Sequence, residues 1–300
     1  MYLLLSFIRG LKKRLKGCEI MCTQIANLDW FITRKCGQRK YCKFCFAPWN
    51  VFPPDTTLSG AMDICERIGE LKIPIVTLCG GEPSEHLYIA EVVQKLYKLG
   101  IQITLYSNIA CQENMEIIKC LLPNIQILSL PIDAVSLDVL PKMRGVHQFE
   151  TMSSMLKYLV CILHRPKIKV GTVVTKQNVS DLDNILEFLL KAEIIDVWRI
   201  YQYSPYGKQA NIIDNFLLED EIFEREMIRI KNQTRNCGLD ISFRNRRDNI
   251  GYCHIMDSQG NFYYYKEEYI NLGVTIYDTP SQILKHYDEN RNYHQKGWQQ

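Results

Sequence analysis

From residue 27 onward, two patterns of apolar and polar positions alternate along the chain. Short, nearly continuous apolar runs, typical of buried strands, are separated by stretches whose apolar residues recur every three or four positions, as on one face of a helix. The predicted strands are Leu28–Thr33, Ile73–Cys79, Ile101–Ser107, Ile125–Leu130, Ile168–Thr175 and Val197–Tyr203. The predicted helices span residues 57–71, 85–99, 111–122, 150–163 and 181–192. This order indicates βαβ units and a parallel sheet.

Six β/α units predict an α/β fold, either a partial (β/α)6 barrel of the TIM type or a doubly wound sheet. In both architectures the loops that follow the carboxyl ends of the strands build the functional site. We therefore look for chemistry in the residues that come directly after each predicted strand.

The pattern changes after residue 210. Residues 217–234 predict a charged amphipathic helix, and two short β-like runs, Gly251–Met256 and Asn261–Tyr265, flank a turn and predict a hairpin. The end of the chain, from about residue 286, is polar and predicted to be loosely held. We divide the chain into an N-terminal segment at 1–24, a core at 25–210, and a small α+β extension at 211–300 that caps the barrel.

Composition narrows the class of protein. The chain has 300 residues, of which 47% are hydrophobic and 23% charged, as in soluble globular proteins. The net charge of +3 is too small to suggest a nucleic-acid partner. Most of the twelve cysteines are scattered singly in apolar contexts, where free thiols pack as small hydrophobes. This usage predicts a reducing, cytoplasmic location.

The first twenty residues carry most of the positive charge. Five Lys or Arg and one Glu accompany an apolar stripe formed by Leu4, Ile8, Leu11 and Leu15. Residues 1–17 therefore predict a basic amphipathic helix suited to peripheral contact with a membrane surface. The alternatives are a solvated or core-docked helix, or an extension upstream of a start at Met21. The order of charges does not fit a signal peptide, and no run approaches the ~20 apolar residues of a membrane span.

Three thiols, Cys36, Cys42 and Cys45, lie within ten residues directly after the first predicted strand. An iron–sulfur cluster that is fully held by protein takes four cysteines. Three thiolates would leave one iron of a four-iron cluster open to a small ligand. The alternative is a structural zinc site, which needs a fourth ligand such as Cys22.

Other unusual residues follow the next three predicted strands. They are Gly80-Gly81-Glu82-Pro83, then Ser107-Asn108, then Leu128–Asp133 followed by Arg144-Gly145. Together with the cysteine run, and with Phe44 before its last thiol, they resemble the radical S-adenosylmethionine (SAM) superfamily over residues 27–265. The resemblance implies a partial (β/α)6 barrel around a [4Fe-4S] cluster. SAM would chelate the open iron and be cleaved reductively to a 5′-deoxyadenosyl radical, which takes a hydrogen atom from the substrate.

The resemblance also implies roles for individual residues. The cluster ligands would be Cys36, Cys42 and Cys45. The SAM-binding residues would be Gly80, Gly81, Glu82 and Pro83 near its amino group, Ser107, Asn108, Ser129 and Arg144 near its ribose or carboxylate, and Phe44 near its adenine. A reductant such as flavodoxin or ferredoxin would supply the electron. The family's usual spacing is C-x3-C-x2-C, whereas this chain has C-x5-C-x2-C.

Within the superfamily, the chain resembles the viperin-like nucleotide dehydratases of antiviral defence. The residues that carry this likeness are Phe31–Arg34, Thr172–Val174 with Asn178, and Trp198–Gln202. It implies substrate contacts from Lys169, Arg199 and Gln202. The chain departs from that branch where Asn50 and Val197 replace expected cations and Asp29 replaces an asparagine.

Two alternatives remain open at this point. The same cofactor chemistry could act on a ribosomal peptide or another small molecule, since Trp198–Gln202 and Ser204–Gly207 also look like radical SAM proteins of that type. A protein of a different class, a zinc-stabilised binding module without catalysis, would explain the cysteine run alone.

Overall fold

The computed structural model describes residues 25–47, 50–205, 210–235, 237–249, 252–265 and 268–289. The predicted helix over residues 1–17 and the thiol of Cys22 lie outside these residues, so the membrane contact and the fourth zinc ligand stay predictions. None of the helices in the described ranges has the length and apolar character that a membrane crossing requires.

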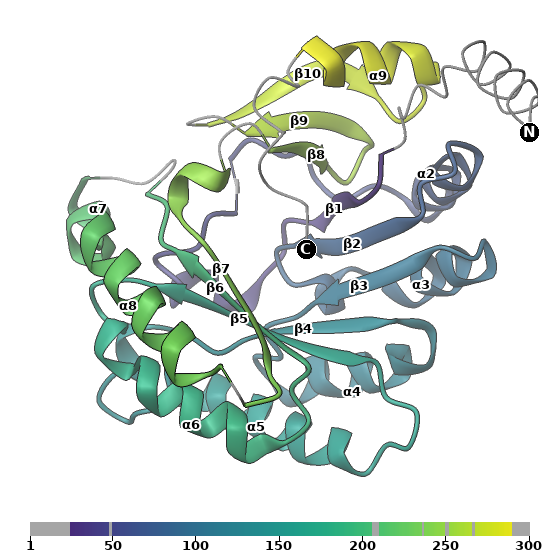
Figure 1. Ribbon diagram of the computed structural model, residues 1–300. Helices are drawn as coiled ribbons and strands as arrows, with labels where there is room; N and C mark the ends of the chain where they lie inside the picture. Colours follow the sequence, from purple (N-terminus) through teal and green to yellow (C-terminus); the bar gives the residue numbers. More distant parts are fainter. Residues whose placement is uncertain are drawn as a thin grey trace, which may run out of the picture.

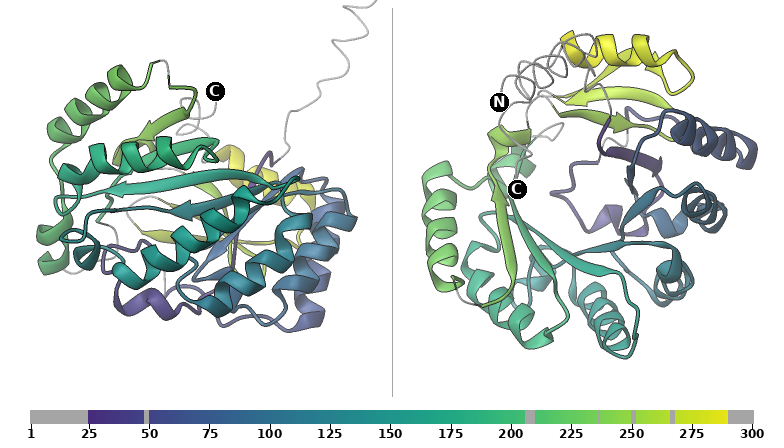
Figure 2. Two further views of the ribbon diagram at one scale, coloured as in Figure 1. Left: turned by 90° about the horizontal axis from the view of Figure 1, so that it is seen from below. Right: turned by 45° about the vertical axis from the view of Figure 1, so that its right-hand side comes forward.

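The centre of the fold is a curved sheet of six parallel strands with helices on its outer face (Figure 1, Figure 2). The strands are β1 Leu28–Thr33, β2 Ile75–Gly80, β3 Gln102–Tyr106, β4 Ile127–Pro131, β5 Lys167–Val174 and β6 Val197–Gln202. The helices are α2 Leu58–Glu70, α3 Ile89–Lys98, α4 Gln112–Leu121, α5 Val146–Val160 and α6 Leu182–Ala192. The sheet does not close, and the predicted partial barrel is confirmed.

Strand β1 has the predicted bounds, and the ends of the other five strands differ from prediction by at most two residues. Two helices differ more. Helix α3 begins at Ile89 because the short 3-10 helix η2, Pro83–Glu85, occupies the start of the predicted segment. Helix α5 begins at Val146, directly after Gly145, whose φ of 92° lies in the region that favours glycine.

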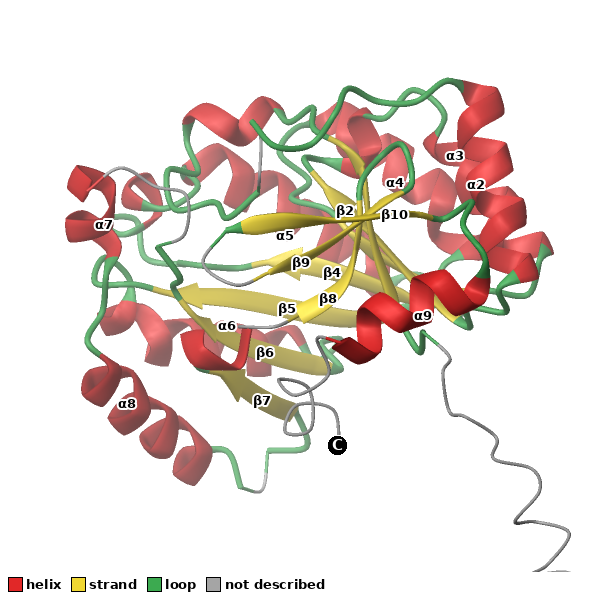
Figure 3. Ribbon diagram, turned by 90° about the horizontal axis from the view of Figure 1, so that it is seen from above, coloured by secondary structure: helices red, strands yellow, loops and turns green. Residues whose placement is uncertain are grey.

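The chain after residue 210 extends the sheet at both edges. It forms α7 Ala210–Phe216, α8 Asp220–Gln233, β7 Asp240–Arg244, β8 Tyr252–Met256, β9 Asn261–Tyr265, β10 Tyr269–Thr275 and α9 Pro280–Glu289. Strand β7 joins β6 in parallel, while β8 joins β1 in parallel and leads into the antiparallel strands β9 and β10. The full order is β10-β9-β8-β1-β2-β3-β4-β5-β6-β7. Helix α9 lies beside β10 (Figure 3).

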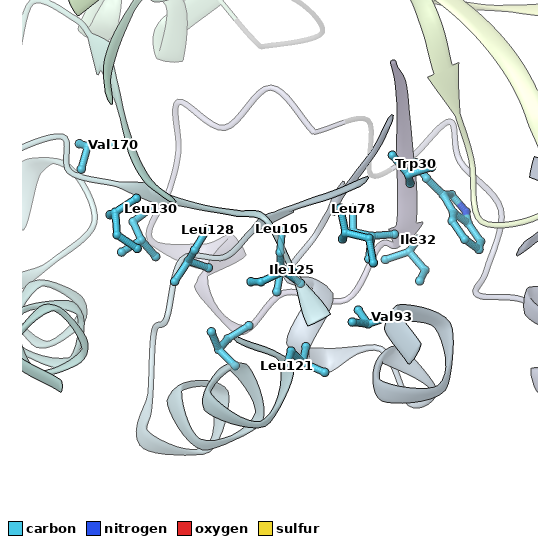
Figure 4. Close-up of a cluster of buried hydrophobic side chains, with 14 of the residues drawn as sticks. Trp30, Ile32, Leu78, Val93, Leu105, Leu121, Ile125, Leu128, Leu130 and Val170 are labelled. Atoms are coloured by element: carbon cyan, nitrogen blue, oxygen red, sulfur yellow. The ribbon is translucent and has the colours of Figure 1, made fainter. Parts of the chain in front are cut away.

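Alternate side chains of the strands serve two different environments, because successive residues of a strand point to opposite faces. The outward positions, such as Trp30, Leu78 and Leu128, pack with helix residues such as Val93 into one large apolar core (Figure 4). The inward positions, including Asp29, Tyr106, Ser129 and Lys169, are mostly polar. Burial of the outward side chains against the helices fixes the orientation of each strand. The polar side chains at the alternate positions therefore point to the inner face, where a ligand can meet them.

Candidate active site

The cysteine loop is anchored to the end of β1 by side-chain hydrogen bonds. The Thr33 hydroxyl donates to the Asp55 carboxylate at 2.9 Å and accepts from the Lys35 backbone N–H at 3.0 Å. Beyond it, the 3-10 helix η1, Gly37–Lys40, takes up the extra length of the C-x5-C spacing. The backbone N–H of Cys42 then donates to the Gln38 carbonyl at 3.0 Å. The long first loop is therefore an ordered helical turn.

Each of the three sulfurs accepts a hydrogen bond from at least one N–H donor. The donors are the side-chain amide of Asn108 to Cys36 at 3.5 Å, the guanidinium of Arg144 to Cys42 at 3.3 Å, and the backbone N–H of Ala47 to Cys45 at 3.5 Å. Donors of this kind stabilise negative charge on sulfur and tune a metal that the sulfur binds. The loop is therefore built to carry thiolates.

Without metal, the thiols of Cys36 and Cys42 hold their protons tightly. Burial raises the pKa of Cys36 to about 12. Burial also raises the pKa of Cys42, although the Arg144 cation opposes it. Metal binding would therefore release protons from this loop. Within the described ranges, no group of three Cys, His, Asp or Glu side chains could hold a single metal ion. A cluster places its ligands on separate irons, so its thiolates need not meet at one point.

The Gly80-Gly81 pair lies against the cysteine loop with no room for side chains. A Cβ atom on Gly81 would lie 1.9 Å from the Lys35 carbonyl oxygen, and one on Gly80 would lie 2.4 Å from that of Thr33. Gly80 also has a φ of 127°, which other residues rarely adopt. The backbone N–H groups of Gly81 and Glu82 donate to Thr33 and Lys35, both at 2.7 Å. These glycines fix the cysteine loop to the end of β2.

Glu82 is fully buried and joins the loops after β2 and β3. Its carboxylate accepts from the Ser84 N–H at 3.1 Å, the Ser84 hydroxyl at 2.7 Å, the Ser107 hydroxyl at 2.8 Å and the Asn108 N–H at 2.7 Å. Burial raises the pKa of Glu82 in spite of these donors. The predicted SAM residues Glu82, Ser107 and Asn108 thus meet at one point. Pro83 is also buried there, at the start of η2.

Arg144 connects the loop after β4 with the cysteine loop. Its Nε donates to the Asp133 carboxylate at 2.5 Å, and the carboxylate's other oxygen accepts from the Val173 N–H on β5 at 2.6 Å. The Arg144 guanidinium also lies over the ring of Phe44, 5.2 Å from its centre. Burial alone would lower the pKa of Arg144, but Asp133 and the nearby Cys42 raise it above its usual value. The cation is therefore permanent and oriented.

Phe44 is buried in a small apolar cluster at the carboxyl end of β6. It packs against Phe216 with ring centres 5.6 Å apart, and Tyr203 lies 6.0 Å from the same ring. The Tyr203 side chain is 1% exposed, and its hydroxyl has no hydrogen-bond partner in the described part of the chain. Tyr203 was not predicted as a site residue, since the sequence shows only a tyrosine at a strand end.

The inner face of β3, β5 and β6 carries a cluster of polar side chains that is separate from the cysteine loop. Lys169 donates to the Tyr106 hydroxyl, which also shares a hydrogen bond with Tyr201. Burial lowers the pKa of Lys169, and the charges of Arg199 and Arg244 add to that effect. Ser129 shares this face, paired in register with Tyr106 on one side and Lys169 on the other. The predicted substrate residues Lys169 and Arg199 are thus brought together.

The third predicted substrate residue, Gln202, is not brought to that face. Its amide N–H donates to Asp220 at 2.7 Å, and its carbonyl accepts from the Arg246 backbone N–H at 3.0 Å. Strand alternation puts Gln202 with Trp198 and Ile200 on the helix side of β6. Sequence reasoning missed Arg244 instead, because the strand that carries it, β7, was not predicted. Arg244 is paired in register with Tyr201.

Comparison with known proteins identifies the family. The sequence profile of the radical SAM superfamily matches residues 30–189. The chain belongs to the radical SAM superfamily. As such an enzyme it uses a [4Fe-4S] cluster and SAM, and the cysteine loop lies within the matched residues.

Individual relatives are distant. The chain is 22% identical to an S-adenosylmethionine-dependent nucleotide dehydratase of Flammeovirga pacifica, over 66% of this chain and 70% of that protein. It is 26% identical to a probable GTP 3′,8-cyclase of Sulfurisphaera tokodaii, over 51% of this chain and 49% of that protein. Thus the chain spans about half the length of the cyclase.

Solved structures share the fold. SuiB of Streptococcus suis bound to S-adenosylmethionine has a TM-score of 0.64 and 17% identity, over 87% of this chain and 64% of SuiB. The protein anSMEcpe with bound AdoMet has a TM-score of 0.66 and 14% identity, over 89% of this chain and 82% of that chain. At these identities the likeness concerns the fold alone.

The residues of this radical SAM enzyme fit both cofactors. Three thiols, each with at least one N–H donor, suit a cluster with one open iron. The side-chain amide of Asn108 donates its N–H to Cys36. The oxygen of the same amide is buried and has no hydrogen-bond partner in the described ranges, so it can accept from a ligand. Arg144 places a permanent cation beside Cys42, where a negatively charged group of the ligand would be favoured. The donors and acceptors for an amino-acid ligand are thus gathered beside the cysteine loop.

Proposed function

We propose that this radical SAM enzyme acts on a nucleotide and removes water from its ribose, as viperin-like dehydratases do, in antiviral defence. The observation that carries the proposal is the charge of the inner face. Lys169, Arg199 and Arg244 are close enough there for each arginine to lower the pKa of Lys169, and Asp29 is the carboxylate that opposes them. Three half-buried cations gathered on one inner face favour an anionic ligand.

A nucleotide's phosphates supply such a partner. Arg199 is already oriented by the Ser242 hydroxyl, which accepts from its Nε at 3.0 Å, so the remaining guanidinium N–H groups can meet phosphate oxygens. The third cation, Arg244, also compensates for the two cations that are replaced by Asn50 and Val197 in this chain. The nucleotide dehydratase of Flammeovirga pacifica supports the same substrate class at low identity.

When bound, the cluster and SAM supply the 5′-deoxyadenosyl radical that takes the hydrogen atom. The chain's residues hold the substrate and move a proton. Once the hydrogen atom has been taken, a ribose hydroxyl group leaves as water only if it gains a proton and the remaining substrate radical takes up one electron from the external reductant. Lys169 is the inner-face cation whose lowered pKa makes it the readiest proton donor. Its hydrogen bond to Tyr106, and that of Tyr106 to Tyr201, holds the ammonium in place.

The test begins with the enzyme reconstituted anaerobically with iron and sulfide. Wild-type enzyme with SAM and dithionite is incubated with each nucleoside triphosphate carrying deuterium on the ribose. We expect deuterium to enter 5′-deoxyadenosine with one of them. A Cys42→Ala variant, which lacks a cluster ligand, is the control that should release no 5′-deoxyadenosine.

The outcomes separate the competing functions. Release of 5′-deoxyadenosine without deuterium from any nucleotide would refute the nucleotide substrate and favour a peptide or other small molecule. A small precursor peptide encoded beside this gene would point the same way. No iron and no cleavage of SAM, with zinc bound instead, would favour the binding module.

A further inference from the structure

The cysteine loop carries an unusual concentration of positive charge. Residues 34–47 contain five Lys or Arg and no Asp or Glu, whereas the whole chain has a net charge of only +3. All five side chains are exposed. We call them the basic loop: Arg34, Lys35, Arg39, Lys40 and Lys43.

Carboxylates of neighbouring elements contact this loop in the described part of the chain. Asp55 pairs with Lys35 at 3.3 Å, and Glu85 accepts from the Gly37 N–H at 2.8 Å. The loop itself carries five cations and no carboxylate, so positive charge outnumbers negative charge within it. Surface cations without a function are usually dispersed among carboxylates to avoid such self-repulsion.

Two exposed aromatic side chains lie within the same loop. Tyr41 is 52% exposed and stacks under the ammonium of Lys40, 4.9 Å from its ring centre. Phe46 is 57% exposed and meets the edge of the Phe31 ring at 6.2 Å. Aromatic residues surrounded by cations are typical of protein–protein interfaces, where they act as anchors.

The basic loop covers the thiols themselves. The extra residues of the C-x5-C spacing form η1, which buries Gln38 and exposes Arg39 and Lys40. Cys36 and Cys45 remain partly exposed between these cations. The added length therefore places two exposed cations on the turn between the first two thiols, near the thiols through which an electron would reach the cluster.

We propose that the basic loop is the docking surface for an acidic one-electron carrier protein. One electron leaves the carrier, which becomes oxidised, and reduces the cluster below the loop. Opposite charges raise the rate of encounter by about 10- to 1,000-fold, and salt reduces this gain. The proposal rests on the radical SAM chemistry alone and does not depend on which substrate the enzyme uses.

The experiment measures reduction of the reconstituted enzyme by reduced flavodoxin in an anaerobic stopped-flow instrument. The test variant is Arg39→Glu/Lys40→Glu. The matched control is Lys98→Glu/Lys157→Glu, which makes the same change of charge at the ends of α3 and α5, where both lysines are exposed. Iron content and reduction by dithionite show whether each variant keeps its cluster.

We expect flavodoxin to reduce the test variant at least tenfold more slowly than wild type and control at low salt. The difference should vanish near 1 M salt, where the screening length falls to about 3 Å. Iron content and dithionite reduction should be the same in all three proteins. Equal flavodoxin rates in test and control variants, or rates that do not change with salt, would overturn the proposal.

A second readout separates docking from attraction of an anionic substrate. With dithionite as reductant, the KM for the substrate that the deuterium experiment identifies should be the same in the test variant and wild type. A raised KM with an unchanged flavodoxin rate would show that the loop steers substrate, and the docking proposal would be wrong. Loss of the flavodoxin rate remains informative even if no nucleotide is a substrate.

Discussion

Arg144 and Asp133 form an ion pair in which Nε lies 2.5 Å from a carboxylate oxygen, and the Asp133 side chain is only 1% exposed. Removing one partner of such a pair leaves a buried charge without compensation, which costs about 3–5 kcal/mol. We therefore expect Asp133→Asn to lower the free energy of unfolding strongly and to weaken SAM binding. Urea denaturation and equilibrium dialysis with SAM measure both.

The control for this pair is a double-mutant cycle. Arg144→Met with Asp133→Asn should recover part of the stability that Asp133→Asn loses, because no charge is then left alone. SAM binding should not recover, since the guanidinium is absent. Additive losses of stability would show that the two side chains do not depend on each other.

The buried carboxyl group of Glu82 should make the free energy of unfolding depend on pH. Burial raises its pKa above the usual 4.5, so the folded state binds its proton more tightly than the unfolded state. Its contribution is fully present below pH 4.5 and is lost as the pH rises through the folded-state pKa. Glu82→Gln should cost about 1–3 kcal/mol, because its NH₂ faces donors.

The difference between wild type and Glu82→Gln isolates this group from all other carboxylates. Wild type should exceed the variant most at low pH, and the gap should narrow toward neutral pH. Urea titrations between pH 4.5 and 8 measure the gap. A gap that widens as the pH rises would mean that the four donors dominate and the pKa is lowered.

Gly81 should tolerate no side chain. In Gly81→Ala the new Cβ would lie 1.9 Å from the Lys35 carbonyl, so the cysteine loop must move. We expect a large loss of stability and of bound iron after reconstitution. Gly69→Ala in α2 is the control: its Cβ would meet Leu99 at an ordinary 3.4 Å, and alanine stabilises a helix by about 0.5–1 kcal/mol over glycine. Normal iron binding by Gly81→Ala would contradict the packing argument.

Lys169→Met should separate stability from function. Burial and the nearby Arg199 lower the pKa of Lys169, so the folded state bears a cost of keeping it charged at neutral pH. The variant should be as stable as wild type or more stable, with the gain shrinking as the pH approaches 10. Affinity for the nucleotide should fall by about 10- to 100-fold, the loss of a charge-assisted hydrogen bond.

Calorimetry and nucleotide binding measure the two effects of Lys169→Met independently. Tyr106→Phe is the matched control, since it removes the partner hydroxyl and keeps the cation. A destabilised variant with unchanged nucleotide binding would place Lys169 in a structural role.

Gln202 should act in stability and not in substrate binding. The NH₂ group of its side-chain amide binds Asp220, and the carbonyl of the same amide binds the Arg246 backbone, so Gln202 joins β6 to both. Gln202→Met would leave these groups without their partner, at a cost of about 1–3 kcal/mol. Thermal unfolding should show the loss, while KM measured below the unfolding temperature should not change. A raised KM at full stability would restore Gln202 as a substrate residue.

The sequence was most informative where local pattern and function coincide. The strands from β1 to β6 are short segments rich in apolar residues, and the loops after them carry the residues that identify the family. The convergence of Glu82, Ser107 and Asn108 followed from the rule that parallel strands end at one rim. None of these inferences required knowledge of distant pairing.

The parts that the sequence did not reveal depend on tertiary contacts. Strand β7 is short, half exposed and lacks a continuous apolar run, so only its pairing with β6 defines it. Arg244 was therefore invisible as an inner-face cation. Gln202 was misleading for the opposite reason: it lies in a motif with Arg199 but follows it by three positions, and an odd offset puts the two side chains on opposite faces of the strand.

Pairing of β1 with β8 has a consequence for synthesis of the protein. Asp29, near the start of the described chain, is in register with Ile255, near its end. While the ribosome makes the intervening residues, the edge of β1 that β8 will cover is open to other strands. A chaperone that shields this edge during synthesis should therefore raise the yield of soluble enzyme before any cofactor is loaded.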